Sequence, residues 1–451
     1  MDRQPARIGS KPSQKASRRE VLKFGAATVA GTALAGASVP RVHAAEDNTI
    51  RLALIGCGGR GSGAVADAFS VADGRVQLYA MADLTEDRVQ RAHGALARHF
   101  ADRMAVPPER RFAGLDAFRA AIDCLRPGDV AMLTAYAYCR PRQLEYAVSK
   151  GVNAFLEKSF APDPAGCRRL LAAGQEAAKR NLKIAMGLQC RHSVARQALL
   201  DKVRAGALGQ LELVHATRGW GGSFLGKPPA NIDHVAWQIQ NRVHFLWASA
   251  GMLSEMLIHQ IDECCWIKDA WPVSASGKGT LATRAGNCAQ NFDTYSIQYT
   301  FPDGGKALVE NVEPFATFIH GSKCAAQFSG NVHAATVHIY KGKEKAKDQI
   351  AWSAPAEPRG PWQAEWKDLL EAIRKDRPYN EVERGVKANL ATIMGRAAVH
   401  MGRTVTWDEV TQSKFAFAPD ADQLKFGGPA PVQPDAEGNY PLPGTTKWVE
   451  V

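Results

Sequence analysis

A charged pair stands at the end of one apolar segment. Residues 155–163 read FLEKSFAPD, and the residues before Glu157 have the apolar character of a buried β-strand. Lys158 precedes a turn rich in proline. A lysine at the end of a strand can donate a hydrogen bond to a reacting oxygen and stabilise negative charge there. The alternative is a solvated loop, and the surrounding elements must decide between the two.

A second stretch combines a carboxylate with an imidazole. Residues 251–266, GMLSEMLIHQIDECCW, are predicted to form a helix with one polar stripe that contains Glu255, His259, Asp262 and Trp266. Glu255 and His259 are one turn apart, so the carboxylate can orient the imidazole and stabilise its protonated form, which suits a general base. The alternative is an amphipathic helix whose polar stripe faces solvent, although such stripes seldom need a tryptophan.

A glycine-rich loop follows the first predicted strand. Residues 49–55, TIRLALI, lead through GCGGRG into a helix of small residues, which is GxGxxG in the strand-to-helix context that binds dinucleotides. The first glycine permits the tight turn, the second lets the backbone approach the pyrophosphate, and the third lets the helix pack closely on the sheet. The helix N-terminus attracts phosphate. The expected cofactor contacts here are Gly56, Gly58, Gly59, Arg60 and Gly61.

The second predicted strand, residues 76–82, ends at Asp83. An acidic residue at this point hydrogen-bonds the adenosine ribose hydroxyls and favours NAD over NADP. Arg88 follows on the next predicted helix and could accommodate a phosphate. The sequence therefore predicts bound NAD, with NADP as the less favoured alternative.

Strands and helices alternate up to residue 190, which predicts an α/β fold with a doubly wound parallel sheet, a Rossmann domain over residues 46–190. Ligands in such sheets bind outside the carboxyl ends of the strands. The predicted strand ends are at Gly56, Asp83, Thr134, Lys158 and residues 189–192. This convergence favours a cleft over a solvated loop for Lys158.

The pattern changes from residue 191. Recurring strands between residues 293 and 338 predict a mostly antiparallel sheet in a C-terminal α/β domain, residues 191–410. Residues 219–231 are rich in glycine and proline and are predicted to form a long loop near a pocket. Residues 411–451 are a Pro/Gly-rich tail that we expect to wrap the surface.

The basic charge is concentrated in a leader. The chain has 451 residues and a net charge of +11, and residues 1–45 hold eight Lys/Arg against two acids. No basic run with interleaved aromatic residues follows, which argues against nucleic-acid binding. Ser17-Arg-Arg-Glu-Val-Leu-Lys23, a soft apolar run and Val42-His-Ala44 resemble a twin-arginine export signal. We expect the export machinery as a partner, a periplasmic or otherwise exported mature chain, and no membrane anchor after cleavage.

The nine cysteines include no CxxC pair and no metal-ligand spacing. An odd count in a chain of this size is not a disulfide framework. We therefore expect free thiols and no metal site.

The sequence resembles the Gfo/Idh/MocA oxidoreductase family over nearly all of residues 48–410. The resemblance rests on four features in this order: the leader, the Rossmann pattern, the Glu-Lys pair, and Glu-x3-His-x2-Asp on a helix. The resemblance implies a C-terminal domain with a large open sheet and a homodimer or homotetramer. It implies that Glu157 and Lys158 match a Glu-Lys-Pro motif in which Ser159 replaces proline. It also implies that His259 matches the catalytic histidine, with Glu255 where many members have Asp.

The implied activity is oxidation of a carbohydrate by hydride transfer to a tightly bound nicotinamide cofactor, which Thr134, Glu157 and Lys158 also contact. His259 would accept the hydroxyl proton while Lys158 stabilises the reacting oxygen. The candidate substrate contacts are Arg191, His192, Trp220 and Asp262. Two alternatives stay open: an NAD-dependent, redox-neutral glycoside hydrolase of the same family, and a carbohydrate-binding protein without catalysis.

Overall fold

The computed structural model describes residues 48–281, 286–330, 336–444 and 447–451. The expected export signal, residues 1–45, lies outside the described residues and stays a prediction. Within the described ranges, no helix is both long and apolar enough to span a bilayer.

Six parallel strands form the first sheet, in the order β3-β2-β1-β4-β5-β6. They are β1 (Ile50–Ile55), β2 (Val76–Asp83), β3 (Arg111–Ala113), β4 (Val130–Leu133), β5 (Asn153–Leu156) and β6 (Ile184–Met186). The accompanying helices are α1 (Gly59–Val71), α2 (Glu86–Phe100), α3 (Ala117–Asp123), α4 (Arg140–Ser149) and α5 (Pro164–Lys179). Strands β4 and β5 are buried along their whole length, as strands covered on both faces require. The strand order confirms the predicted Rossmann fold.

Nine strands form the second sheet, in the order β14-β13-β12-β11-β7-β10-β9-β8-β15. They are β7 (Leu211–Thr217), β8 (Ser274–Thr280), β9 (Thr294–Thr300), β10 (Lys306–Glu310), β11 (Ala316–Gly321), β12 (Ala325–Ser329), β13 (His338–Tyr340), β14 (Ile350–Ser353) and β15 (Val405–Thr406). All neighbours are antiparallel except β7 and β10. This confirms the predicted mostly antiparallel sheet.

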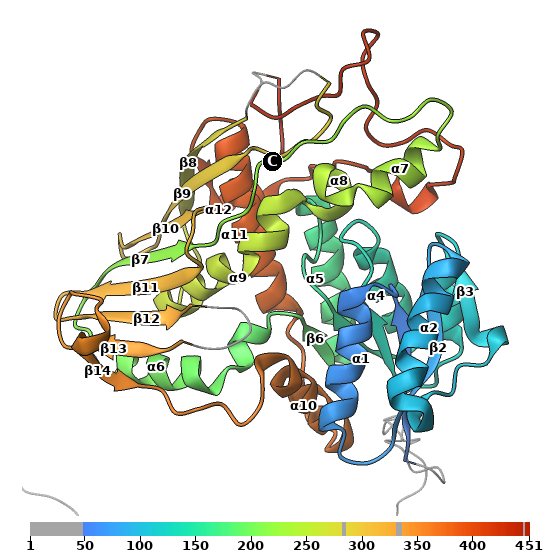
Figure 1. Ribbon diagram of the computed structural model, residues 1–451, viewed down its shortest axis with the longest axis horizontal. Coiled ribbons are helices and arrows are strands. Elements are labelled where there is room, and N and C mark those ends of the chain that lie inside the picture. The colour runs from blue at the N-terminus through green and yellow to red at the C-terminus, as the bar shows by residue number, and fades with distance from the viewer. Residues whose placement is uncertain (1–47, 282–285, 331–335, 445–446) are drawn as a thin grey trace, which may run out of the picture. The chain divides into compact units, whose positions relative to one another are not determined.

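Two long helices pack between the sheets. The helices of this half are α6 (Val194–Arg204), α7 (His234–Gln240), α8 (Leu246–Ser249), α9 (Gly251–Lys268), α10 (Pro361–Arg374), α11 (Val382–His400) and α12 (Trp407–Gln412). Helix α9 packs on β7, and α11 contacts α9, α5 and β8 (Figure 1). The polar stripe of α9 is covered, since His259 is 5% and Asp262 1% exposed. The solvent-facing interpretation of this helix is therefore wrong.

The C-terminal tail differs from the expectation that it only wraps the surface. Its penultimate residue, Glu450, is fully buried. The carboxylate is paired there with the Arg396 guanidinium and the His400 imidazole, and such pairing is what makes a buried charge tolerable.

Candidate active site

The glycine loop, residues 56–61, is closely packed at Gly56 and Gly61 and forms an open cradle at Gly58 and Gly59. Gly56 has φ +103°, and a Cβ on Gly61 would overlap the Gly56 carbonyl oxygen. At Gly58 and Gly59, by contrast, a Cβ would meet no atom within 4 Å. The backbone is therefore tight where α1 meets the sheet and exposed where a ligand can approach. The first N–H groups of α1 are available to phosphate there.

A cavity of about 340 Å³ opens from this cradle. Its lining includes five loop residues, Gly56, Gly58, Gly59, Arg60 and Gly61, together with Asp83 and Thr134. The Thr134 hydroxyl donates to the Gly56 carbonyl oxygen at 2.7 Å, which fixes the turn of the loop. Asp83 accepts N–H bonds from Cys57 and Leu84, both at 2.6 Å. Its carboxylate is thus held at the cavity wall, where it can also accept hydrogen bonds from the ribose hydroxyl groups of a dinucleotide.

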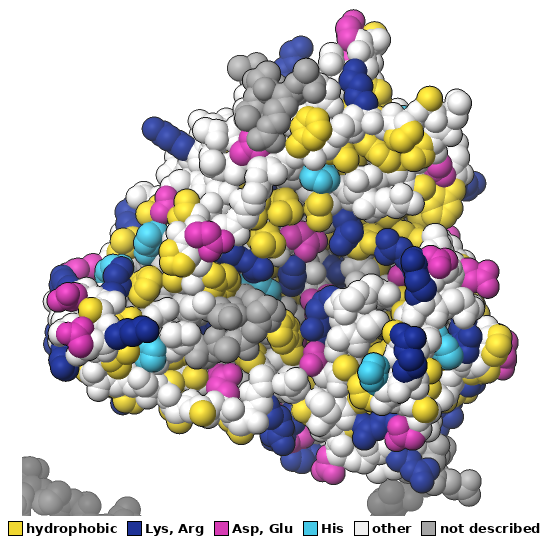
Figure 2. Space-filling model, viewed as in Figure 1, with side chains coloured by type: hydrophobic (Ala, Val, Ile, Leu, Met, Phe, Trp, Pro, Cys, Tyr) yellow, Lys and Arg dark blue, Asp and Glu magenta, His cyan; other side chains and the backbone are white. Residues whose placement is uncertain are grey.

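One cavity residue, Arg242, carries no clear sequence signal, unlike Arg88, which the sequence indicated as a candidate phosphate contact. Arg88 donates to the Tyr136 hydroxyl at 3.2 Å, and Arg242 lies over the Tyr136 ring at 4.2 Å. Arg242 comes from a short 3-10 helix, Arg242–His244, far along the chain, so only the tertiary fold brings it here. On the face drawn in Figure 2, Lys and Arg side chains gather around the central hollow. Arg60, Arg88 and Arg242 are among the residues that line the cavity, and their positive charge favours an anionic ligand.

Lys158 projects from the end of β5 onto α9. Its ammonium donates to the carboxylate of Glu255 at 2.9 Å and to the Glu255 carbonyl oxygen at 2.7 Å. The two side chains are 21% and 24% exposed, so the pair is largely covered but open on one side. The sequence interpretation paired Glu255 with His259. The structure places the Glu255 carboxylate on Lys158, because β5 and α9 meet here.

The backbone around Lys158 is held from several directions. Glu157 is 5% exposed and forms an ion pair with Arg60 of the glycine loop at 2.9 Å. The Lys158–Ser159 peptide bond is cis, where the family motif has proline. The fully buried Arg140 donates to the Ser159 carbonyl oxygen. Asn389 accepts the next N–H, that of Phe160, at 3.1 Å.

His259 lies one turn beyond Glu255 on α9 and is 5% exposed. Lys158 contacts the same helix one turn earlier, so both proposed catalytic side chains belong to one region of the molecule. The role of His259 as a base stays a prediction.

The four candidate substrate residues fall into two groups. Arg191 binds both carboxylate oxygens of Asp262, at 2.9 and 2.8 Å, and Asp262 is 1% exposed. His192 is buried against Asp368 at 2.7 Å; burial lowers its pKa, but Asp368 and Glu381 outweigh this and raise the pKa to about 10. These three side chains are engaged within the protein, which favours a supporting role. Trp220 is half-buried beside Tyr295, and its contact with substrate stays a prediction.

No protein-family model matches the chain, and no curated protein matches it by sequence. The fold has many solved counterparts. Aldose-aldose oxidoreductase from Caulobacter crescentus, solved with glycerol, superposes with a TM-score of 0.62 at 19% identity, covering 79% of this chain and 99% of that one. UDP-N-acetylglucosamine 3-dehydrogenase from Acidithiobacillus ferrooxidans has a TM-score of 0.56 at 20% identity, covering 78% and 98%.

A third counterpart carries its ligands. Scyllo-inositol dehydrogenase from Lactobacillus casei, solved with NAD(H) and scyllo-inositol, has a TM-score of 0.56 at 17% identity, covering 79% of this chain and 99% of that one. At these identities the likeness establishes the shared fold, a Rossmann sheet followed by a mostly antiparallel sheet. The chemistry must be argued from the side chains of this chain.

Proposed function

We propose that the protein is an NAD(P)-dependent oxidoreductase that acts on a sugar or sugar derivative. One observation carries the proposal: the Lys158 ammonium is clamped by Glu255 at the same edge of the parallel sheet at which the glycine cradle opens. A dinucleotide site and a positioned cation at one sheet edge are what hydride transfer to or from an alcohol needs.

The residues present fit a dinucleotide. Gly58 and Gly59 leave open space where the pyrophosphate backbone contact is expected, and Asp83 stands at the cavity wall for the ribose. When bound, the dinucleotide supplies the hydride acceptor. Asp83 supports NAD over NADP, because its carboxylate would repel a 2′-phosphate. Arg88 also lines the cavity and is the residue most able to offset that repulsion.

Three side chains of the protein would carry out the other steps of the reaction. Lys158 donates a hydrogen bond to the substrate oxygen and stabilises the negative charge that develops as its proton leaves. His259 accepts that proton. Glu255 holds the Lys158 ammonium in place, because its carboxylate accepts a hydrogen bond from that ammonium at 2.9 Å. Because these groups are largely buried, they interact more strongly than they would in water.

The substrate class rests on the fold counterparts, which are an aldose-aldose oxidoreductase, a UDP-N-acetylglucosamine 3-dehydrogenase and a scyllo-inositol dehydrogenase. All are polyhydroxylated rings, so we propose a cyclic polyol or sugar for this protein. We further propose export through the twin-arginine route, a tightly retained cofactor and a homo-oligomer. The leader composition and the family resemblance support these three points.

The proposal is tested on purified protein. Denaturing it should release NAD or NADP in near-stoichiometric amount, identified by mass spectrometry. A panel of aldoses, inositols and uronic acids should then include one that changes the redox state of the bound nicotinamide in the intact protein. Protein that neither contains a dinucleotide nor binds an added one would contradict the proposal.

The same panel separates the alternative activities. Aryl glycosides that release their aglycone without net cofactor reduction would indicate the redox-neutral hydrolase. A protein that binds a sugar but never changes the state of its nicotinamide would be a carbohydrate-binding protein.

A further inference from the structure

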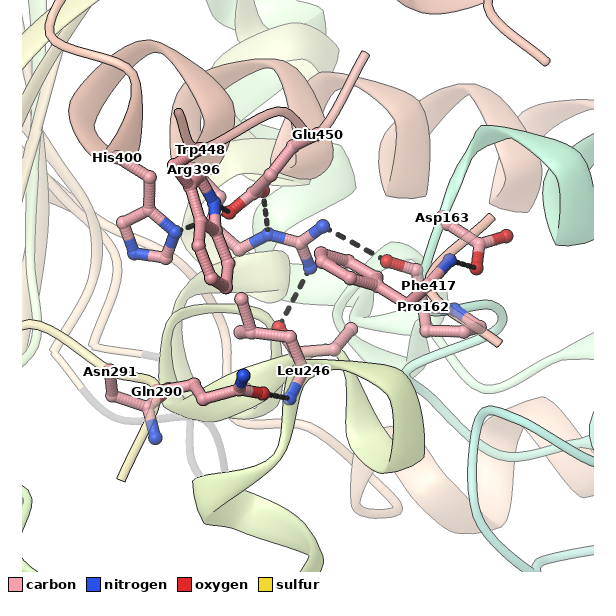
Figure 3. A network of polar contacts seen from close by, with 12 residues as sticks. Pro162, Asp163, Leu246, Gln290, Asn291, Arg396, His400, Phe417, Trp448 and Glu450 are labelled. Atoms are coloured by element: carbon pink, nitrogen blue, oxygen red, sulfur yellow. Dashed lines mark hydrogen bonds and ion pairs between the residues drawn. The ribbon is translucent and has the colours of Figure 1, made fainter. Parts of the chain in front are cut away.

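The end of the chain is bound in the core beside the candidate site. Glu450, Arg396 and His400 are all fully buried. Glu450 Oε2 lies 2.7 Å from Arg396 Nε, and its Oε1 lies 2.5 Å from His400 Nδ1. The Trp448 indole N–H donates to the same Oε1 at 2.7 Å. Figure 3 shows the side chains of Arg396, His400 and Trp448 converging on the Glu450 carboxylate.

Arg396 has two further donors, and both contact backbone that leads to the candidate site. Its Nη1 donates to the Ala250 carbonyl oxygen at 2.8 Å and its Nη2 to the Pro162 carbonyl oxygen at 3.0 Å (Figure 3). Ala250 has φ +69° and is the N-cap residue of α9, about one and a half turns before Glu255. Pro162 lies in the turn just after Lys158. Arg396 therefore joins the two segments that carry the Lys158–Glu255 pair.

The tail contacts the same turn at a second place. The Phe417 N–H donates to Asp163 Oδ2 at 3.0 Å, and the Ala165 N–H donates to the Phe415 carbonyl oxygen at 3.1 Å. The Phe417 ring also lies 5.3 Å from the Arg396 guanidinium. The turn after Lys158 is thus fixed between the tail and Arg396.

Removal of the Glu450 charge would leave Arg396 as a buried cation whose hydrogen-bonded carboxylate is gone. A buried unpaired charge is strongly destabilising, so the guanidinium would move or recruit water. Either response changes its bonds to Ala250 and Pro162. None of these network residues lines the dinucleotide cavity.

We propose that Glu450 is a positioning residue for catalysis: through Arg396 it fixes the turn after Lys158 relative to the start of α9. The inference rests on the proposed function for its kinetic consequence, and on the geometry alone for its structural one. It assigns to the C-terminal residues a part in turnover that is separate from cofactor retention.

The main variant is Glu450→Gln in the full chain, with Glu437→Gln as the matched control, because Glu437 is an exposed glutamate of the same tail. We expect unchanged dinucleotide content, KM within about twofold, and kcat lowered by about 10- to 100-fold, the range for a small misplacement of reacting groups. Glu437→Gln should match the wild type. A Glu450→Gln protein with wild-type kcat would overturn the proposal.

A second readout does not depend on activity. Acetylation of Lys158 by a limiting acylating reagent, followed by peptide mass spectrometry, measures whether the ammonium is still clamped by Glu255. The rate at Lys158 should rise several-fold in Glu450→Gln and stay constant in Glu437→Gln. An unchanged rate contradicts the inference even if the wild type oxidises no sugar, whereas failure of the proposed function alone leaves this rate increase intact.

A low kcat in Glu450→Gln could come from poor folding instead of mispositioning. The double variant Arg396→Met/Glu450→Leu, which removes both charges, distinguishes the two causes. Apolar replacement of a buried ion pair is often neutral for stability. This variant should fold and retain dinucleotide, yet show the low kcat and the raised Lys158 acetylation, because the Ala250 and Pro162 carbonyl oxygens lose the Arg396 donor. Normal turnover and labelling in the double variant would show that the pair serves stability only.

Discussion

Glu450 makes a pH-dependent contribution to stability whose size follows from its surroundings. Burial alone would raise its pKa, but Arg396 and His400 outweigh burial and lower the pKa from 4.5 to about 2. A carboxyl group whose pKa is depressed by folding stabilises the protein above the unfolded-state pKa, and this stabilisation is lost as the pH falls through the folded-state pKa. The full shift corresponds to about 3 kcal/mol at pH 7.

Glutamine at position 450 has no charge at any pH. The difference in unfolding free energy between the wild type and Glu450→Gln therefore measures this contribution. We expect Glu450→Gln to be less stable than the wild type by about 3 kcal/mol above ~pH 5, narrowing to ~1.4 kcal/mol near ~pH 3. Urea unfolding of both proteins across this pH range measures the difference, and other carboxyl groups cancel because both chains share them. Glu437→Gln provides the baseline. A difference that stays constant between ~pH 6 and ~pH 3, or is below ~1 kcal/mol throughout, would refute the reasoning.

Further predictions concern the dinucleotide cavity and Lys158. Lys158→Met should lower kcat by about 10²–10³-fold with dinucleotide content unchanged, whereas Lys179→Met, at a surface lysine, should have no effect; equal kcat values would contradict the assigned role. Gly58→Ala and Gly61→Ala should both reduce bound dinucleotide. Only Gly61→Ala should also destabilise the protein, by about 1–3 kcal/mol in urea unfolding, because its Cβ has no room. Asp83→Ser should shift the measured NADP/NAD affinity ratio toward NADP by about tenfold or more, and an unchanged ratio would show that Asp83 does not select the cofactor.

Local sequence patterns predicted the parts of the site that depend on local geometry. The glycine loop needs only a strand, a turn and a helix in succession, so GCGGRG could be placed with its roles from the sequence. The ends of β2, β4 and β5 follow from apolar runs, and parallel pairing brings them to one edge. The position of Lys158 at that edge was therefore predictable.

The partners of those side chains were not predictable in the same way. Helical spacing brings Glu255 close to His259, but it contains no information about Lys158, which lies 97 positions away and competes for the same carboxylate. Arg191 and Asp262 form a bidentate pair across 71 positions for the same reason. Glu450 carried no sequence signal either, because a Pro/Gly-rich segment with two isolated glutamates has the composition of a surface segment. Only its burial against Arg396 shows otherwise.

The central claim is that this site moves hydride between a cyclic alcohol and a nicotinamide held in the glycine cradle. In the most direct measurement, the purified protein is incubated with a substrate from the panel that carries deuterium at the reacting carbon. The dinucleotide is then released by denaturation, and its mass is determined by mass spectrometry. Within the time of one wild-type turnover, we expect one deuterium on the nicotinamide in the wild type and almost none in Lys158→Met. A released dinucleotide without deuterium, while the sugar is consumed by the wild type, would contradict it.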